Sequence, residues 1–148
     1  MHLRAQIRTA LAALLQGLPS TGTRVYQSRS LPVDPAHLGG PCLLVWCGAE
    51  QIDQTLAGAP QLRRQVEVTA RIVAKDTASL EDVLDQAIAE VEAAIAAQFT
   101  VGGLIPAGLR LDRIDTGIDQ SLERPVGMAQ LTWRGEYYTQ RGNPHQSA

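Results

Sequence analysis

Three aspartates come closest to a cluster that could carry out chemistry. Asp112, Asp115 and Asp119 lie near one another in the sequence, and paired carboxylates can bind a metal ion or act as acid and base. In an extended strand, the odd spacing of Asp112 and Asp115 places them on opposite faces unless a β-bulge realigns them. Arg110 and Arg113 stand close by and can neutralise them. We therefore expect an ion pair or a solvated strand edge, not a catalytic site.

The histidines and cysteines form no recognisable motif. His2, His37 and His145 are scattered through one end, a loop and the tail, so they lack the i, i+4 spacing of a zinc-binding helix. Cys42 and Cys47 fall in an expected strand at an odd spacing, which directs their side chains to opposite faces. We expect two buried free thiols, no disulfide and no metal site.

Sequence motifs for phosphate binding and nucleophilic catalysis are missing. Gly102-Gly103 lacks the lysine of a phosphate-binding loop and the spacing of a dinucleotide-binding loop, and it follows an expected helix. The serines do not stand in a nucleophile-elbow context. The sequence therefore predicts a protein that is not an enzyme and uses no cofactor.

The most regular element is an amphipathic helix expected over 79–98. Its apolar residues recur at spacings of three and four, as in a helix that lies on a core, and Ser79 followed by Asp82 resembles a capping box. The other face is acidic throughout, with Glu81, Asp82, Asp85, Glu90 and Glu92. We expect a solubilising face there, or one that meets basic groups of a neighbouring copy such as Arg63 and Arg64.

Two strands of alternating polarity flank this helix in the sequence. Over 65–75 and 126–138, apolar residues occupy every second position, as in strands with one buried face. The apolar run over 42–47 suits a strand covered on both faces, or one whose outer face is buried by a partner. A less regular strand over 108–118 is expected to contain a bulge near Asp112.

The order of elements predicts the fold class. A helix over 2–18, stopped by Pro19, and a short strand over 23–28 precede the elements above. We expect an α+β fold with a mixed or antiparallel sheet of four to five strands and two helices packed on one face. The other sheet face should be polar. A single domain is expected over 1–140 and a disordered polar tail over 141–148.

Composition and charge limit the classes of partner. The chain of 148 residues is 45% hydrophobic, with a formal net charge of -2, which is typical of one globular domain. Dedicated nucleic-acid-binding domains are usually basic, so we expect no direct nucleic-acid binding. The sequence has no apolar run that could span a bilayer and no signal-peptide pattern. We therefore expect a soluble cytoplasmic protein without a membrane partner.

The segment 48–62 is the first place to look for partner contacts. It is expected to be a long hairpin loop or a ribbon beyond the sheet, and such connections often have a functional role; a merely mobile hairpin is the alternative. Mixed charges on the adjacent strands suit either solvated surface or a subunit interface. The interface candidates are Glu50, Gln51, Asp53, Gln54, Arg63, Arg64, Glu67, Arg71, Arg134 and Glu136.

Short stretches along the chain resemble one protein family. They are Leu-Arg-Ala-Gln-Ile from Leu3, Leu-Pro-Val-Asp from Leu31, Cys-Gly-Ala-Glu from Cys47, Gln-Val-Glu-Val-Thr-Ala from Gln65, Leu-Glu-Asp-Val-Leu-Asp from Leu80 and Ala-Gln-Leu-Thr-Trp from Ala129. In this order they resemble the tail terminator proteins of long-tailed phages, the minor tail protein U group of lambda-like phages. The resemblance covers residues 3–139. The insertion at 39–41 and the polar C-terminal tail depart from it.

The resemblance implies a structural virion protein. Tail terminators are α+β domains that assemble as a hexameric ring on the tail tube, stop its polymerisation and offer a surface to the head–neck complex. The implied partners are other copies of this chain, a tail tube protein and a head-completion or neck protein. The implied location is the virion tail, after assembly in the host cytoplasm. Another phage neck or head–tail joining component and a small-ligand-binding regulatory domain are the alternatives.

Overall fold

The computed structural model describes residues 1–32, 34, 37–53, 60–75, 79–119 and 126–147. The elements follow the chain in a simple order, with one helix before the first strands and one helix in the middle. They are α1 (Leu3–Leu14), β1 (Val25–Tyr26), β2 (Cys42–Asp53), β3 (Gln61–Lys75), α2 (Leu80–Ala97), β4 (Arg110–Asp119), β5 (Val126–Gln140) and β6 (Asn143–Ser147).

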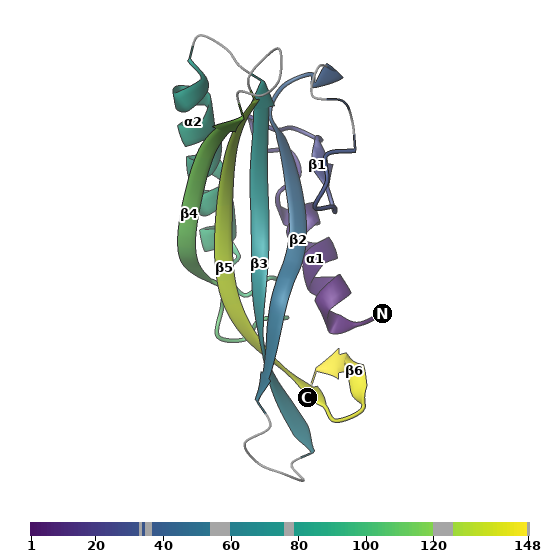
Figure 1. The fold of residues 1–148 in the computed structure, drawn as a ribbon. Helices are drawn as coiled ribbons and strands as arrows, with labels where there is room; N and C mark the ends of the chain where they lie inside the picture. The colour runs from purple at the N-terminus through teal and green to yellow at the C-terminus, as the bar shows by residue number, and fades with distance from the viewer. Residues whose placement is uncertain (33, 35–36, 54–59, 76–78, 120–125, 148) are drawn as a thin grey trace.

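The strands form one mixed sheet. Its order is β1-β2-β3-β5-β4, and β6 pairs with the end of β5. β1 runs parallel to β2, and the other pairs are antiparallel. Both helices lie on the same face of the sheet, α1 on β2 and α2 on β3 and β5 (Figure 1). The α+β prediction is confirmed, and the six strands of the described residues exceed the four to five expected.

The core lies between the sheet and the two helices. The alternation predicted for β3 and β5 is confirmed, because every second residue is buried under the helices from Val66 to Ala74 in β3 and from Ala129 to Tyr137 in β5. Glycines bring the helical layer close to β5. A Cβ on Gly127 would lie 2.9 Å from Leu80 at the start of α2, and one on Gly135 would lie 2.8 Å from Ile105. We call this side of the sheet the helix face.

The other side, the second face, is less polar than the sequence suggests. A small apolar cluster of Leu38, Cys42, Leu44, Val73 and Val126 is buried there. Tyr26 and Leu31 pack against it from the chain before β2, so the chain itself covers the outer side of the apolar run 42–47. Cys42 lies in this cluster and Cys47 in the main core. Both are free thiols, as predicted, and burial raises the pKa of each to about 11.

Helix ends differ from the expected ones for local reasons. α1 ends at Leu14 rather than near residue 18, and the backbone turns at Gly17, whose φ of 81° suits glycine. α2 matches its expected range within one residue at each end. The expected capping box is wrong, because the Ser79 side chain makes no capping hydrogen bond.

The segment 48–62 continues the sheet. After a bulge between Cys47 and Glu50, β2 stays paired with β3 from Glu50–Val66 to Asp53–Arg63. We call the paired residues 50–53 and 63–66 the ribbon; it extends beyond the helices at the lower end of Figure 1. The tail is not disordered as expected, because Asn143–Ser147 forms β6 against β5.

Candidate interaction surfaces

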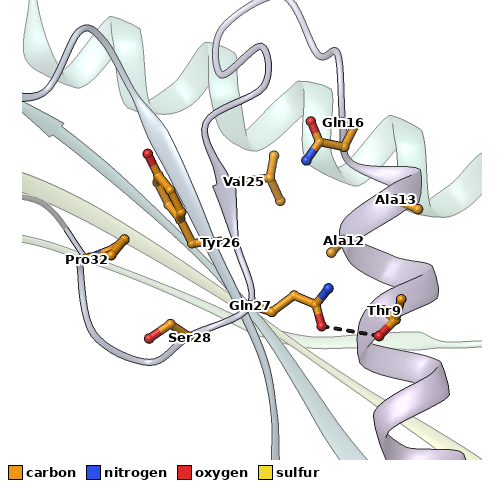
Figure 2. A pocket seen from close by; sticks show the side chains of 9 residues that line it. All are labelled: Thr9, Ala12, Ala13, Gln16, Val25, Tyr26, Gln27, Ser28 and Pro32. Carbon is orange, nitrogen blue, oxygen red and sulfur yellow. Dashed lines mark hydrogen bonds between the residues drawn. The ribbon is translucent and has the colours of Figure 1, made fainter.

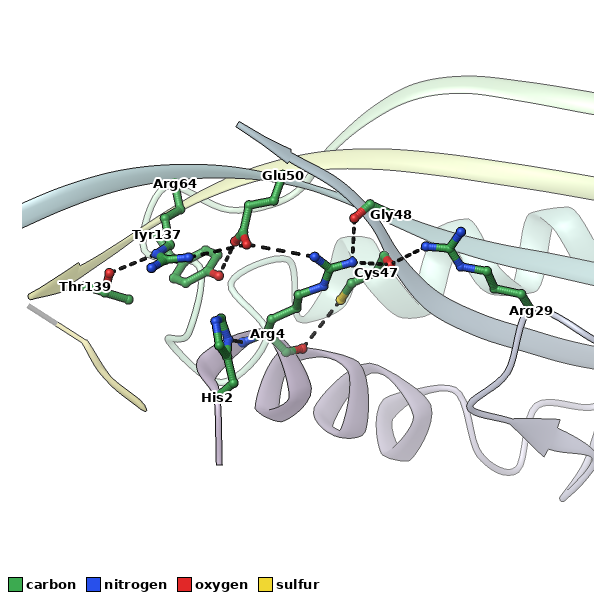
Figure 3. A network of polar contacts seen from close by, with 9 residues as sticks. All are labelled: His2, Arg4, Arg29, Cys47, Gly48, Glu50, Arg64, Tyr137 and Thr139. Carbon is green, nitrogen blue, oxygen red and sulfur yellow. Dashed lines mark hydrogen bonds and ion pairs between the residues drawn. The ribbon is translucent and has the colours of Figure 1, made fainter. Parts of the chain in front are cut away.

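A buried carboxylate holds the base of the ribbon. The Glu50 side chain is 9% exposed, accepts a hydrogen bond from the Tyr137 hydroxyl and lies 3.5 Å from Nη1 of Arg64. Nε of Arg64 donates to Oγ1 of Thr139 at 2.9 Å. Burial and the nearby Glu50 carboxylate raise the pKa of the Tyr137 hydroxyl, so it remains a donor. Figure 3 shows these contacts joining β2, β3 and β5.

The first helix is tied to the same place. Nη2 of Arg4 donates to the carbonyl oxygens of Cys47 at 2.8 Å and Gly48 at 2.7 Å, at the bulge that begins the ribbon. Its Nη1 lies 4.0 Å from the Glu50 carboxylate. His2 caps the helix, because its Nδ1 accepts a hydrogen bond from the Arg4 backbone at 3.0 Å. Carbonyl groups left unpaired by a bulge need partners, and Arg4 supplies them (Figure 3).

On the second face, at and near the ribbon, charged side chains of neighbouring strands form ion pairs. Nη2 of Arg134 lies 3.5 Å from Glu67, and its Nε lies 3.5 Å from Asp112 but is not aligned for a hydrogen bond. Arg63 lies 3.4 Å from Glu136. Exposed ion pairs of this kind contribute ~0–1 kcal/mol each. Their main effect is to match opposite charges within the chain, which leaves less net charge for a partner.

Arg71 is held further up the second face. Its Nε and Nη2 donate to Oε1 of Gln130 at 3.1 and 2.7 Å. Its guanidinium carbon lies 5.0 Å from the centre of the Trp46 ring, within range of a cation–π interaction. Arg71 therefore links β2, β3 and β5 within the sheet, away from the ribbon.

The expected interface residues separate into three groups. Glu50 and Arg64 belong to the inward network, and the Arg64 side chain is 11% exposed; its contact with acids of a neighbouring copy stays a prediction. Polar residues of mixed charge lie together on the second face, at the ribbon and on the strands next to it. They are Gln51, Asp53, Arg63, Glu67, Arg134 and Glu136. Arg71 lies apart from both groups, and Gln54 lies outside the described residues.

One exposed surface was missed by sequence reasoning. Leu111, Ile114 and Ile118 of β4 are 42%, 39% and 41% exposed. Leu111 and Ile114 pair with Trp133 and Leu131 of β5, which places them on the helix face, yet α2 does not cover them. The sequence predicted an irregular strand here but not its exposure, since only the position of α2 shows that β4 is uncovered.

A second missed feature is an open groove of about 600 Å³ between α1 and β1. Figure 2 shows Ala12, Ala13 and Val25 along it, with Gln27 close to Thr9. Oγ1 of Thr9 donates to Oε1 of Gln27 at 3.3 Å. The groove is lined by small apolar and neutral polar groups, so it suits an apolar side chain better than a charged ligand.

Asp112 and Asp115 of β4 form ion pairs, as one of the two sequence interpretations predicts. The bulge falls between Leu111 and Arg113, and Arg113 lies 3.9 Å from Asp112 and 3.2 Å from Asp115. Among the described residues, no group of histidine, cysteine and acidic side chains could hold a metal ion. None of the helices in these residues is long and apolar enough to cross a membrane.

Comparisons with known proteins add no family assignment. No family model matches the sequence, and no curated protein matches it significantly.

Proposed function

We propose that this chain is a structural subunit of a phage tail that resembles tail terminators. In this proposal, copies of the chain form a ring through the open edges of each subunit, not through the charges already paired inside it. The ring caps the tail tube, stops its polymerisation and presents a surface to a head-completion or neck protein. A hexamer is the ring size that the resemblance implies.

The anchored ribbon is the observation that carries the proposal. At the base of the ribbon, Glu50 of β2 contacts side chains from β3, β5 and α1. Arg4 of α1 also donates hydrogen bonds to the carbonyl groups of the bulge. Buried charges are costly unless they are paired and hydrogen-bonded. A fold that fixes a projecting ribbon in this way presents it in a constant direction. A defined direction is what a subunit needs to meet a neighbour or a tube in an ordered assembly.

The test is a polymerisation assay with the tail tube protein encoded alongside this chain. We expect tubes grown with the protein to stop at a limited length and to carry a ring at one end by electron microscopy. Bovine serum albumin at equal mass is the control for non-specific effects. Tubes of unchanged length with bare ends would contradict the proposed function. Binding to a neck protein without any effect on the tube would favour the alternative head–tail joining component.

A further inference from the structure

The two helices lie on one face of the sheet, toward its opposite edges, and carry opposite charge. Residues 1–33 include four arginines, Arg4, Arg8, Arg24 and Arg29, and no acidic residue. α2 contains acidic residues and no basic one. The α1 side of the molecule is therefore basic, and the α2 side is acidic (Figure 1).

Most of the basic charge has no acidic partner. Nε of Arg8 donates to Oε1 of Gln27 at 3.1 Å, and Arg24 and Arg29 donate to backbone carbonyls at 2.9 and 3.3 Å. Within the part of the chain that the structure describes, these three arginines make no ion pair within 4.0 Å. Their charge is available to an acidic partner.

Three of the acidic residues of α2 lie on the flank that faces away from α1. Glu90 accepts hydrogen bonds from the backbone and hydroxyl of Ser20, just after α1, at 2.8 and 2.5 Å. At about 100° per residue, Glu81, Asp85 and Glu92 fall on the opposite flank. That flank lies toward β4, because α2 packs on β3 and β5 and β4 is the next strand of the sheet. Acidic charge thus stands beside the uncovered residues Leu111, Ile114 and Ile118.

We infer that the α2–β4 edge of one copy docks head-to-tail on the α1–β1 edge of a second copy. The apolar row of β4 enters the groove beside Ala13, and the acids of α2 face Arg8 and its neighbours. β4 and β1 are the two ends of the sheet, so the helix faces of both copies stay on the same side. This inference rests on the proposed function, because it names the surfaces that build the ring. Two different surfaces in contact generate a ring when the rotation closes.

Charge exchange tests the electrostatic part of the junction. We expect Asp85→Arg to weaken self-association about tenfold, because it places like charges together, and Arg8→Glu added to Asp85→Arg to restore it. Asp82→Arg is the matched control, since Asp82 lies on the same helix but points away from the sheet. Equal assembly of Asp85→Arg and Asp82→Arg, measured by sedimentation velocity, would overturn the inference.

Mixing two blocked variants tests the head-to-tail arrangement. Ile114→Asp places a charge on the β4 row, and Ala13→Glu places one in the groove; Leu111→Ser is a second, milder β4 variant. All three positions are exposed, so circular dichroism should match the wild type. Each variant alone should remain a monomer. An equal mixture of Ile114→Asp and Ala13→Glu should form a dimer and nothing larger. The β4 edge of Ala13→Glu can still dock in the groove of Ile114→Asp, but the other two surfaces are blocked.

The outcomes separate this inference from the proposed function. If both blocked variants assemble like the wild type, the ring stands but uses other surfaces, and the inference is wrong. If Ala13→Glu assembles while Ile114→Asp does not, the β4 edge pairs with itself, and the head-to-tail arrangement is wrong. If the wild type neither assembles nor affects the tail tube, the proposed function itself fails.

Discussion

The Tyr137 hydroxyl in β5 donates a hydrogen bond to the Glu50 carboxylate in β2, across the intervening strand β3. The contact lies at the point where the ribbon leaves the helices. Arg64 and Arg4 balance the same carboxylate from β3 and α1. A buried carboxylate with these partners fixes how the ribbon projects, and the ribbon is the part of the fold on which the proposed function depends.

Removing the Tyr137 hydroxyl should destabilise the protein. Tyr137→Phe keeps the ring in the core but leaves the Glu50 carboxylate with one hydrogen bond fewer, which should lower the free energy of unfolding by ~1–3 kcal/mol. Tyr138→Phe is the matched control, because Tyr138 is exposed on the other face, and it should change stability by less than ~0.5 kcal/mol. Urea denaturation measures both. Equal stability of the two variants would show that the Glu50 contact contributes nothing.

Shortening the ribbon should separate folding from assembly. Replacing residues 54–62 with Asn-Gly joins Asp53 to its strand partner Arg63 through a two-residue turn. The Glu50 network remains, so circular dichroism should match the wild type while ring formation or tube capping is lost. Assembly of the shortened chain at wild-type concentration would mean that the replaced segment makes no essential contact.

Acid should weaken the contact between α2 and the chain after α1. Burial acts to raise the pKa of Glu90, but hydrogen bonds from Ser20 and Gln86 outweigh it and lower this pKa from its ordinary value of 4.5. The charged form therefore stabilises the fold above pH 4.5, and this contribution is lost as the pH falls through the lowered pKa.

Glu90→Gln should reduce that pH dependence. Between about pH 7 and about pH 3, its free energy of unfolding should fall less than that of the wild type. Glu92→Gln, on the same helix but without the Ser20 partner, should behave like the wild type. Parallel stability curves for the wild type and Glu90→Gln would contradict the role assigned to Glu90.

Close packing of the helices on β5 predicts a contrast between two strand glycines. A Cβ on Gly127 would lie 2.9 Å from both methyl carbons of Leu80, whereas one on Gly117 in β4 would meet nothing within 4 Å. Gly127→Ala should therefore lower the free energy of unfolding by ~1–3 kcal/mol, and Gly117→Ala should leave it unchanged or raise it. Thermal unfolding of the two variants measures the difference. A destabilised Gly117→Ala would show that β4 is less open than described.

The buried faces of β3 and β5 could be predicted because they depend on local periodicity. Alternation assigns Val66 and Val68, or Leu131 and Trp133, to one face without knowledge of the fold. The α2 range was equally accessible, since its apolar stripe is continuous. These patterns determine which side of an element is buried, but they do not determine what covers it.

The interaction surfaces depend on contacts between distant parts of the chain. Arg64 was named as an interface candidate because it is charged. In the structure its side chain contacts Glu50 and Thr139 and is largely buried. Ile114 and Ile118 were expected in a less regular strand with a bulge near Asp112, but the sequence did not show that α2 leaves them uncovered. Only the order of the strands shows that β4 is an edge.

The central claim is that this chain builds a ring, and its mass in solution tests that claim most directly. Light scattering at two protein concentrations, with and without the tail tube protein, should give a particle of six times the chain mass of 15.9 kDa. A mass that stays at 15.9 kDa at both concentrations and also with the tube protein would contradict the account.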